Sequence, residues 1–106
     1  MTTESKQSYE LGEGEAETLA DMLRLMGEPH RLRILIMCLD EECPVGDIAQ
    51  KLDMTPSLTS HHLRLLKAAR LVRSRRQGKQ VFYTAADHHV RHVISDLVAH
   101  IQEERT

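Results

Sequence analysis

The pattern of apolar and polar positions predicts five helices and one β-hairpin. Apolar residues recur every three to four positions in five segments, as on the buried face of an amphipathic helix. These segments are residues 15–26, 29–39, 45–52, 56–69 and 87–104. Strand-forming residues dominate 71–74 and 80–84, and the polar segment between them contains Gly78, as in a hairpin. Residues 1–14 have little to bury, so we expect a flexible N-terminal tail ahead of a single domain over 15–106.

The order of these elements predicts a winged helix-turn-helix. Asp53, Met54 and Thr55 form a tight turn before the helix 56–69, with Thr55 as N-cap and Pro56 as the first helical residue. Two short helices joined by such a turn make a helix-turn-helix, and the hairpin that follows takes the place of the wing. The expected fold class is therefore mainly α with a β-hairpin wing. Because a chain of 106 residues builds only a modest core, we expect it to dimerise through its N- and C-terminal helices.

Charge is distributed unevenly along the chain, although the net charge is only −2. No acidic residue occurs between Asp53 and Asp87, and this stretch holds seven of the 14 Lys and Arg residues. Such asymmetry is typical of a basic face directed at a polyanion. Taken alone, the charge fits an ordinary solvated surface better, so the interpretation as a DNA-binding face depends on the elements that carry it.

One side of the predicted helix 56–69 carries residues that suit the major groove of DNA. These residues are Ser57, Ser60, His61, Arg64 and Lys67. Short hydroxyl groups allow a close approach to DNA, and Arg64 can pair with guanine or with phosphate. The hairpin adds four cations for the DNA backbone, namely Arg73, Arg75, Arg76 and Lys79. The opposite arc of the helix contains Leu58, Leu65, Leu66 and Ala69, and we expect His62 to lie at the edge of the core.

The last predicted helix carries candidate metal ligands. Four of the seven histidines fall within the last nineteen residues. A polar stripe beside the apolar face of this helix contains His89, His92, Asp96, His100 and Glu103. Imidazole and carboxylate groups are ligands that zinc takes in tetrahedral sites. Residue by residue, solvated polar side chains beside a dimer interface are the simpler interpretation, so the spacing of these residues decides whether they bind a metal.

Helix geometry separates these residues into two pairs. His89 and His100 are eleven residues apart, or about 16 Å along a helix axis, which is too far for one ion. Asp87 lies beside His89 at the helix start, and Glu103 lies one turn from His100. The pairs meet only if a second copy of the helix runs antiparallel to the first. A two-fold dimer then has two sites, each with Asp87 and His89 from one copy and His100 and Glu103 from the other.

This ligand set leaves the metal and some ligands open. Two imidazoles and two carboxylates suit Zn(II), and Co(II), Ni(II) and Cd(II) remain alternatives. His88, His92 and Asp96 remain alternatives as ligands.

The chain resembles the ArsR/SmtB family of metal-responsive bacterial repressors over residues 17–104. The resemblance is carried by the segments GEPHRLRIL, VGDIAQKL, TPSLTSHHLRLLKAARLV, RSRRQGKQVFYT and DHHV…AHIQE. It implies a homodimer that binds double-stranded operator DNA in the apo state, through residues that include Ser57, Ser60 and His61. The terminal pattern resembles that of the zinc-sensing subgroup, which implies release of DNA when Zn(II) binds across the C-terminal helices. The resemblance also implies a hydrogen-bonded relay from His100 toward the backbone near Arg70.

Three alternatives stay open at this point. A repressor of the same fold could sense redox state through Cys38 and Cys43. A small zinc enzyme is a second alternative, but four protein ligands leave no open position for water, and we expect no enzymatic activity. A metal buffer is the third, although it would have no use for the basic wing. The polar N-terminus lacks an apolar signal core, so we expect a cytoplasmic protein.

Overall fold

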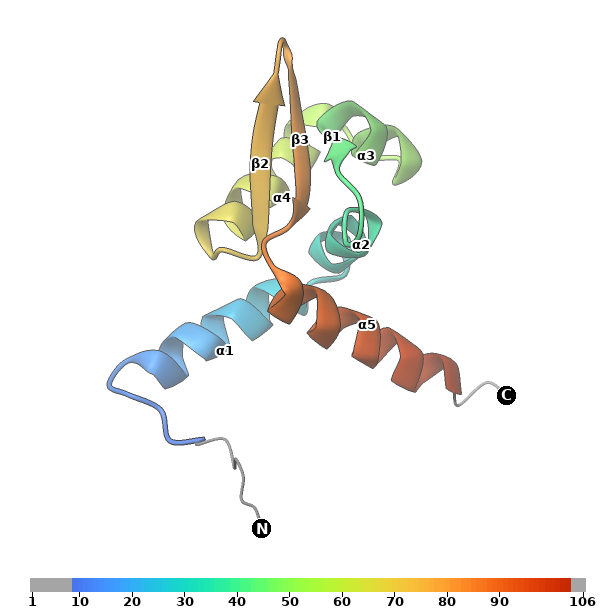
Figure 1. Ribbon diagram of the computed structural model, residues 1–106. Coiled ribbons are helices and arrows are strands. Elements are labelled where there is room, and N and C mark those ends of the chain that lie inside the picture. Colours follow the sequence, from blue (N-terminus) through green and yellow to red (C-terminus); the bar gives the residue numbers. More distant parts are fainter. Residues whose placement is uncertain (1–8, 104–106) are drawn as a thin grey trace.

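Helices and strands follow one another in the order of a winged helix-turn-helix (Figure 1). The structure, a computed structural model, describes residues 9–103. Its elements are α1 (Glu15–Met26), α2 (Pro29–Met37), β1 (Cys43–Pro44), α3 (Val45–Lys51), α4 (Pro56–Ala68), β2 (Val72–Gln77), β3 (Gln80–Ala85) and α5 (His88–Glu103). The predicted fold class is confirmed, and the boundaries of the predicted elements shift by no more than a few residues.

Side-chain caps fix where three of the helices begin. Glu28 Oε1 accepts a hydrogen bond from the Arg31 N–H at 2.9 Å, ahead of Pro29. Thr55 Oγ1 accepts one from the Leu58 N–H at 3.1 Å, as the sequence predicts. Asp87 Oδ1 accepts one from the Val90 N–H at 3.1 Å, so Asp87 is the cap of α5 and not its first helical residue. Each cap satisfies a backbone donor that the helix itself leaves unpaired.

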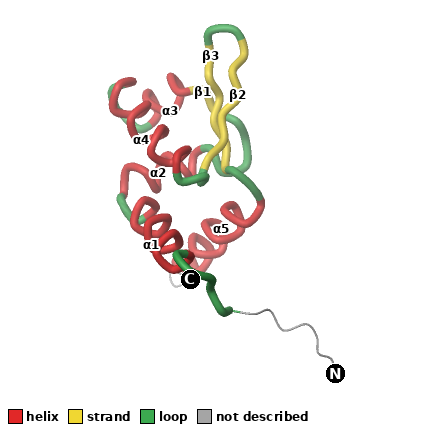
Figure 2. Tube along the Cα trace, turned by 90° about the vertical axis from the view of Figure 1, so that its left-hand side faces the viewer, coloured by secondary structure: helices red, strands yellow, loops and turns green. Residues whose placement is uncertain are grey.

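The hairpin forms a small antiparallel sheet together with a strand that the sequence analysis did not predict. The strand order is β1-β3-β2, with Ser74 opposite Tyr83 on β3 and Cys43 on its other side. Gly78 makes the hairpin turn with a φ of 64°, which favours glycine. Strand β1 has only two residues, too few to show an alternating pattern. Figure 2 shows the β2–β3 tip extending beyond the helices.

The base of the wing is tied to the end of α2. The Cys38 carbonyl accepts hydrogen bonds from the Ala85 N–H at 3.0 Å and from Thr84 Oγ1 at 3.2 Å. The Ala86 N–H donates to the Leu71 carbonyl at 3.0 Å, so the strands are also joined where they leave the helices. The orientation of the wing is therefore set by the core.

One hydrophobic core joins α2, α3, α4, the wing base and the first half of α5. Its fully buried side chains include Ile34, Leu35, Ile48, Leu63, Leu66 and Leu71. Helix α1 contributes only partly buried residues, and Figure 1 shows α1 and α5 on the side of the molecule away from the wing tip. Among residues 9–103, no helix combines the length and the apolar character needed to cross a membrane.

The predicted flexible tail and the domain limits stay predictions. Residues 9–14 form no helix or strand, and residues 1–8 of the predicted tail lie outside the described part of the chain. The last predicted helical residue, Glu104, also lies outside it.

Candidate DNA-binding surface and candidate metal ligands

Helix α4 presents the predicted DNA-binding residues on its outer face. Ser57, His61, Arg64 and Lys67 are exposed, and Ser60 is half-buried. Asp53, with a φ of 55°, occupies the left-handed region in the turn before α4, and the Met54 N–H donates to the Ala49 carbonyl at 2.9 Å. This hydrogen-bonded turn holds α4 against α3 and directs the face that carries His61 and Arg64 to solvent.

The buried face of α4 differs from the predicted apolar arc. Leu58 was assigned to that arc, but it is 43% exposed, whereas Thr59, Leu63 and Leu66 are fully buried. Thr59 satisfies its hydroxyl within the helix, because Oγ1 donates to the Thr55 carbonyl at 2.8 Å. The sequence analysis placed only apolar residues on the buried face, so it left out Thr59 and included Leu58 instead. The candidate DNA-binding face is not affected by this correction.

His62 lies at the edge of the core, as the sequence predicts, and contacts the start of α2. Its ring stacks on that of His30, with centroids 6.0 Å apart and planes 5° apart. His30 Nδ1 in turn lies 3.1 Å from Glu28 Oε2. The Nδ1 atom of His62 is buried without a hydrogen-bond partner among the described residues. Burial lowers the pKa of His62, because a charged imidazole would lose its hydration.

The wing carries the predicted cations, but one of them is already paired. Arg73, Arg76 and Lys79 are exposed. Arg75 donates to both oxygens of Glu42, from Nη2 to Oε1 at 2.7 Å and from Nε to Oε2 at 2.9 Å, and its Nη1 donates to Gln77 Oε1 at 2.9 Å. Its guanidinium carbon also lies 4.9 Å from the centroid of the Phe82 ring. The hydrogen bonds with Glu42 raise the pKa of Arg75 and lower that of Glu42.

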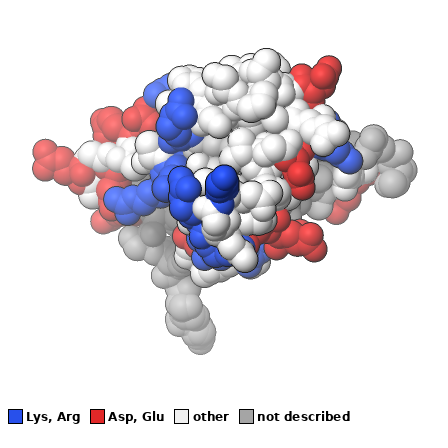
Figure 3. Space-filling view, turned by 90° about the horizontal axis from the view of Figure 1, so that it is seen from above, with Lys and Arg blue, Asp and Glu red and all other residues white. Residues whose placement is uncertain are grey.

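This pairing changes the prediction for Arg75. Thirty-three positions separate Glu42 from Arg75, so sequence spacing gave no signal for the contact. Glu42 and Gln77 hold the Arg75 donors that a DNA phosphate would use, which leaves Arg73, Arg76 and Lys79 as the exposed candidates on the wing. Seen from the direction of the wing tip, Lys and Arg gather on one side of this face, while most Asp and Glu lie toward the edges (Figure 3).

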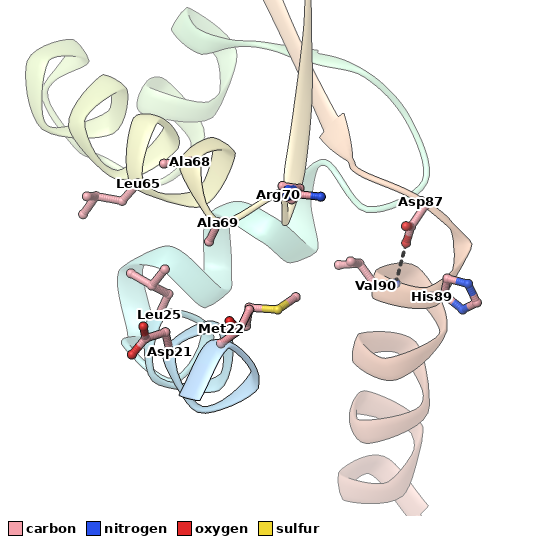
Figure 4. A pocket seen from close by; sticks show the side chains of 11 residues that line it. Asp21, Met22, Leu25, Leu65, Ala68, Ala69, Arg70, Asp87, His89 and Val90 are labelled. Atoms are coloured by element: carbon pink, nitrogen blue, oxygen red, sulfur yellow. Dashed lines mark hydrogen bonds between the residues drawn. The ribbon is translucent and has the colours of Figure 1, made fainter. Parts of the chain in front are cut away.

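The first candidate metal pair lies beside the end of α4. Asp87, His89 and Arg70 line one pocket together with apolar residues of α1 and α4, among them Met22 and Leu65 (Figure 4). One Asp87 oxygen accepts the Val90 N–H, and the pKa of Asp87 is lowered by that hydrogen bond and, to a smaller extent, by the neighbouring His89. A carboxylate that is ionised and positioned in this way is suited to a cation, because each of its oxygens carries more than one lone pair.

The second candidate pair lies at the other end of α5. His100 and Glu103 both belong to α5, which is helical from His88 to Glu103, and both are exposed. Within residues 9–103, no group of three or more His, Cys, Asp or Glu residues is arranged to hold a metal ion. The donor set of two imidazoles and two carboxylates fits a zinc-type ion. Within one chain, however, this set is divided into two separate pairs at opposite ends of α5.

The two halves border an exposed apolar strip on α5, which the rest of the described chain leaves largely uncovered. Val93, Leu97 and Ile101 of α5 are 46%, 55% and 62% exposed. Leu19 and Leu23 of α1 are also about half exposed. In each helix the apolar face is therefore wider than the part that packs on the chain's own core, and the remainder is exposed to solvent.

The two thiols belong to neither the candidate DNA-binding face nor the candidate metal pairs. Cys38 is fully buried, and burial raises its pKa to about 12. Cys43 is half-buried and its Sγ lies 3.6 Å from the Met37 carbonyl. Burial, followed by the charges of Asp47 and Glu41, raises its pKa as well. Both groups are therefore mainly in the weakly nucleophilic thiol form at neutral pH.

Comparison with known proteins gives relatives of the same architecture. Residues 28–74 match the family of bacterial regulatory proteins described as the arsR family. The chain is 35% identical over 89 residues to a transcriptional repressor SmtB homolog of Synechocystis, and these residues cover 84% of this chain and 67% of that protein. It is 39% identical over 80 residues to the transcriptional regulator CmtR of Mycobacterium bovis, covering 76% of this chain and 68% of that protein. The chain thus spans about two thirds of the length of these curated relatives.

Solved structures agree with these matches. Reduced HlyU from Vibrio cholerae superposes with a TM-score of 0.74 at 34% identity, covering 80% of this chain and 90% of that one. The homodimeric winged helix-turn-helix domain Mb0332 of Mycobacterium bovis superposes with a TM-score of 0.77 at 26% identity, covering 92% and 93%. The fold, the family match and the identity to full regulators agree: the chain belongs to the ArsR family of bacterial regulatory proteins, which are winged-helix DNA-binding regulators and not enzymes.

Proposed function

We propose that this chain is a homodimeric repressor that binds operator DNA in the apo state and releases it when Zn(II) binds between the two copies of α5. The observation that carries the proposal is the position of the four candidate ligands. Asp87 and His89 lie at one end of α5 and His100 and Glu103 at the other, on both sides of an exposed apolar strip. The SmtB homolog of Synechocystis and CmtR, both curated transcriptional regulators, support regulation of transcription.

The dimer follows from the strip formed by Val93, Leu97 and Ile101. A second copy running antiparallel would cover this strip and remove apolar surface from water. The same arrangement places His89 opposite His100 of the second copy. The homodimeric domain Mb0332 supports an assembly of two chains for this architecture. Two copies would present two α4 helices to successive half-sites of a two-fold operator.

The DNA contacts are divided between the helix and the wing. Ser57, Ser60, His61, Arg64 and Lys67 belong to the face of α4 that enters the major groove. Arg73, Arg76 and Lys79 on the wing contact phosphates, and Arg75 holds Glu42 instead. Phosphate contacts position the protein, whereas base contacts from α4 select the sequence.

The residues at the ends of α5 hold the effector. Asp87 and His89 of one copy and His100 and Glu103 of the other provide two oxygens and two nitrogens, a set that suits Zn(II) and that Co(II), Ni(II) and Cd(II) also accept. When bound, the cation supplies a cross-link between the two copies of α5. Asp87 and His89 share a pocket with the end of α4, so a change in the angle of α5 reaches the DNA-binding helix through a short path. If metal weakens DNA binding, DNA weakens metal binding by the same factor.

The relay to Arg70 also needs the second copy. Arg70 lines the pocket with Asp87 and His89, whereas His100 of the same chain lies about 16 Å further along α5. A hydrogen bond from His100 to the backbone near Arg70 therefore joins one copy to the other. Such a bond to the second imidazole nitrogen would fix the orientation of a metal-binding histidine.

Redox sensing through Cys38 and Cys43 is the alternative within the same fold. HlyU, which is 37% identical over 73 residues, has a solved structure described as reduced. The raised pKa of both thiols favours the metal proposal, because thiolates react with peroxide much faster than thiols do. Operator affinity that stays unchanged after peroxide treatment would dismiss this alternative.

Fluorescence anisotropy with an operator duplex, selected from random DNA by the apo protein, tests the proposal. We expect Zn(II) to lower the affinity of the wild type. The variant His100→Ala should keep its apo affinity and lose the response to zinc, and Gln102→Ala, at an exposed position of the same helix, serves as the matched control that keeps it. Wild-type affinity that does not change with zinc would refute release by metal, and a loss of apo binding in His100→Ala would refute the role given to His100.

A further inference from the structure

Two exposed histidines on α5 have no part in the site proposed above. His88 and His92 lie one helical turn apart, and their rings approach edge to face with centroids 5.7 Å apart. The ring of His88 also lies 4.0 Å from that of His89. Three imidazoles therefore crowd the first turns of this helix.

Around α5, His88 and His92 lie farther from the apolar strip than the candidate ligands His89, His100 and Glu103 do, although His92 shares their polar stripe. At about 100° per residue, their midpoint lies about 140° around the axis of α5 from the midpoint of Val93 and Leu97. Val90 and Ile94 pack on the chain's own core, on another side of the helix. A ligand held by His88 and His92 would therefore lie in solvent, and its binding would need no second copy of the chain.

The spacing of the two rings fits a shared metal ion. A ring centre lies roughly 3.2 Å from a metal bound to its nitrogen, so two neighbouring imidazoles on one ion have centres about 4.5 Å apart at a right angle and about 5.2 Å apart at the tetrahedral angle. The observed 5.7 Å is slightly longer, and small rotations of the two exposed side chains would bring both nitrogens to one ion. The positive end of the α5 dipole opposes a cation here, but the Asp87 carboxylate at the cap offsets it.

We propose that His88 and His92 together bind one divalent transition-metal cation, separately from the ligands at the dimer surface. Since no third His, Cys, Asp or Glu among residues 9–103 completes a cluster with them, water fills the remaining positions. This site is therefore weaker and exchanges faster than one with four protein ligands. Imidazole nitrogens favour Ni²⁺, Cu²⁺ and Zn²⁺ over Mg²⁺ or Ca²⁺.

Ni²⁺ is the probe that tests this site. The double variant His89→Ala/His100→Ala removes two ligands of the proposed dimer site and leaves His88 and His92. We expect calorimetry to show about one Ni²⁺ bound per chain in this variant, with paramagnetic broadening of NMR signals centred on residues 88–96. Adding His92→Ala should weaken Ni²⁺ binding by about 10- to 100-fold or more. Removing a residue that only hydrogen-bonds to a metal ligand already costs this much affinity, and His92 would be a ligand itself.

A spacing control separates a chelate from single histidines. Adding His92→Ala together with Ser95→His to the double variant restores the number of imidazoles but separates the pair by seven positions, so binding should stay weak. Binding that returns in this variant, or broadening centred on His30 and His61, would overturn the proposal. Complete loss of Ni²⁺ in His89→Ala/His100→Ala would also overturn it, while leaving zinc-dependent release from DNA intact as a separate question.

Discussion

The Glu42 carboxylate accepts hydrogen bonds from the Arg75 guanidinium, at Oε1 from Nη2 over 2.7 Å and at Oε2 from Nε over 2.9 Å. Glu42 lies just before β1 and Arg75 in β2, and β3 lies between these two strands in the sheet. The ion pair therefore spans the sheet. It holds Arg75 in place, although the sequence analysis predicts that this residue contacts DNA.

Removing the Glu42 charge should strengthen DNA binding. In Glu42→Gln, Arg75 loses its ionic partner and is held only by a neutral amide oxygen, and a negative charge near the DNA phosphates disappears, so we expect tighter binding with a steeper salt dependence. Arg76→Ala should reduce the slope of log affinity against log salt by about one, whereas Arg75→Ala should change it less. Anisotropy at several salt concentrations measures all three slopes. Equal slopes for Arg75→Ala and Arg76→Ala would show that Arg75 leaves Glu42 to bind DNA.

Asp87 combines a helix cap with a candidate metal ligand, and two substitutions separate these roles. Asn is as good an N-cap as Asp, so Asp87→Asn should melt close to the wild type while losing the zinc response. Asp87→Ala should lose the zinc response and also melt at a lower temperature. Thermal unfolding and zinc-dependent anisotropy give the two readouts. An Asp87→Asn variant that still responds fully to zinc would remove Asp87 from the ligand set.

His62 should make the domain less stable in mild acid. Burial lowers its pKa, the attraction of Glu28 opposes this shift, and the nearby Arg31, His61 and His30 add smaller effects that lower the pKa further. The fold therefore favours the neutral ring, so this contribution to stability is complete above the unfolded pKa of about 6.5 and is lost as the pH falls below it. Between about pH 7.5 and 5.5, the free energy of unfolding should fall more in the wild type than in His62→Gln. Parallel curves for the two proteins would contradict the direction of this shift.

The orientation of α4 can be tested with two leucines. Leu63 is fully buried, so Leu63→Ala should lower the free energy of unfolding by about 2–5 kcal/mol. Leu58 is 43% exposed, so Leu58→Ala should change it by less than about 0.5 kcal/mol. Urea unfolding followed by circular dichroism measures both. A large loss in Leu58→Ala would restore the arc predicted from the sequence.

Local signals explain why the fold could be predicted. Thr55 and Pro56 mark the start of α4, and Gly78 marks the hairpin turn, because caps and turns depend on a few neighbouring residues. Features that depend on distant contacts were missed. Strand β1 forms by pairing with β3, about 40 positions further along the chain. The burial of Thr59 was missed for a different reason: its hydroxyl donates to the Thr55 carbonyl within the same helix, which lets a polar residue lie in the core.

The candidate sites show the same limit in different ways. The outer face of α4 follows from helix periodicity, so the sequence predicted the exposure of Ser57, His61, Arg64 and Lys67, while their contacts with DNA stay a prediction. The pairing of Arg75 with Glu42 joins residues 33 positions apart, which no local pattern reveals. For the metal ligands, the spacing of His89 and His100 shows that one chain holds two separate ligand pairs. Whether these pairs form one site depends on how a second chain packs against α5, which a single chain does not show.

The attachment of the wing to the Cys38 carbonyl has an evolutionary consequence. Because Thr84 and Ala85 anchor the hairpin at its root, substitutions around Gly78 would change what the tip touches without disturbing the folded body. Related regulators could then acquire new operator preferences by altering a few residues at the tip, while selection for a stable scaffold acts mainly on the root.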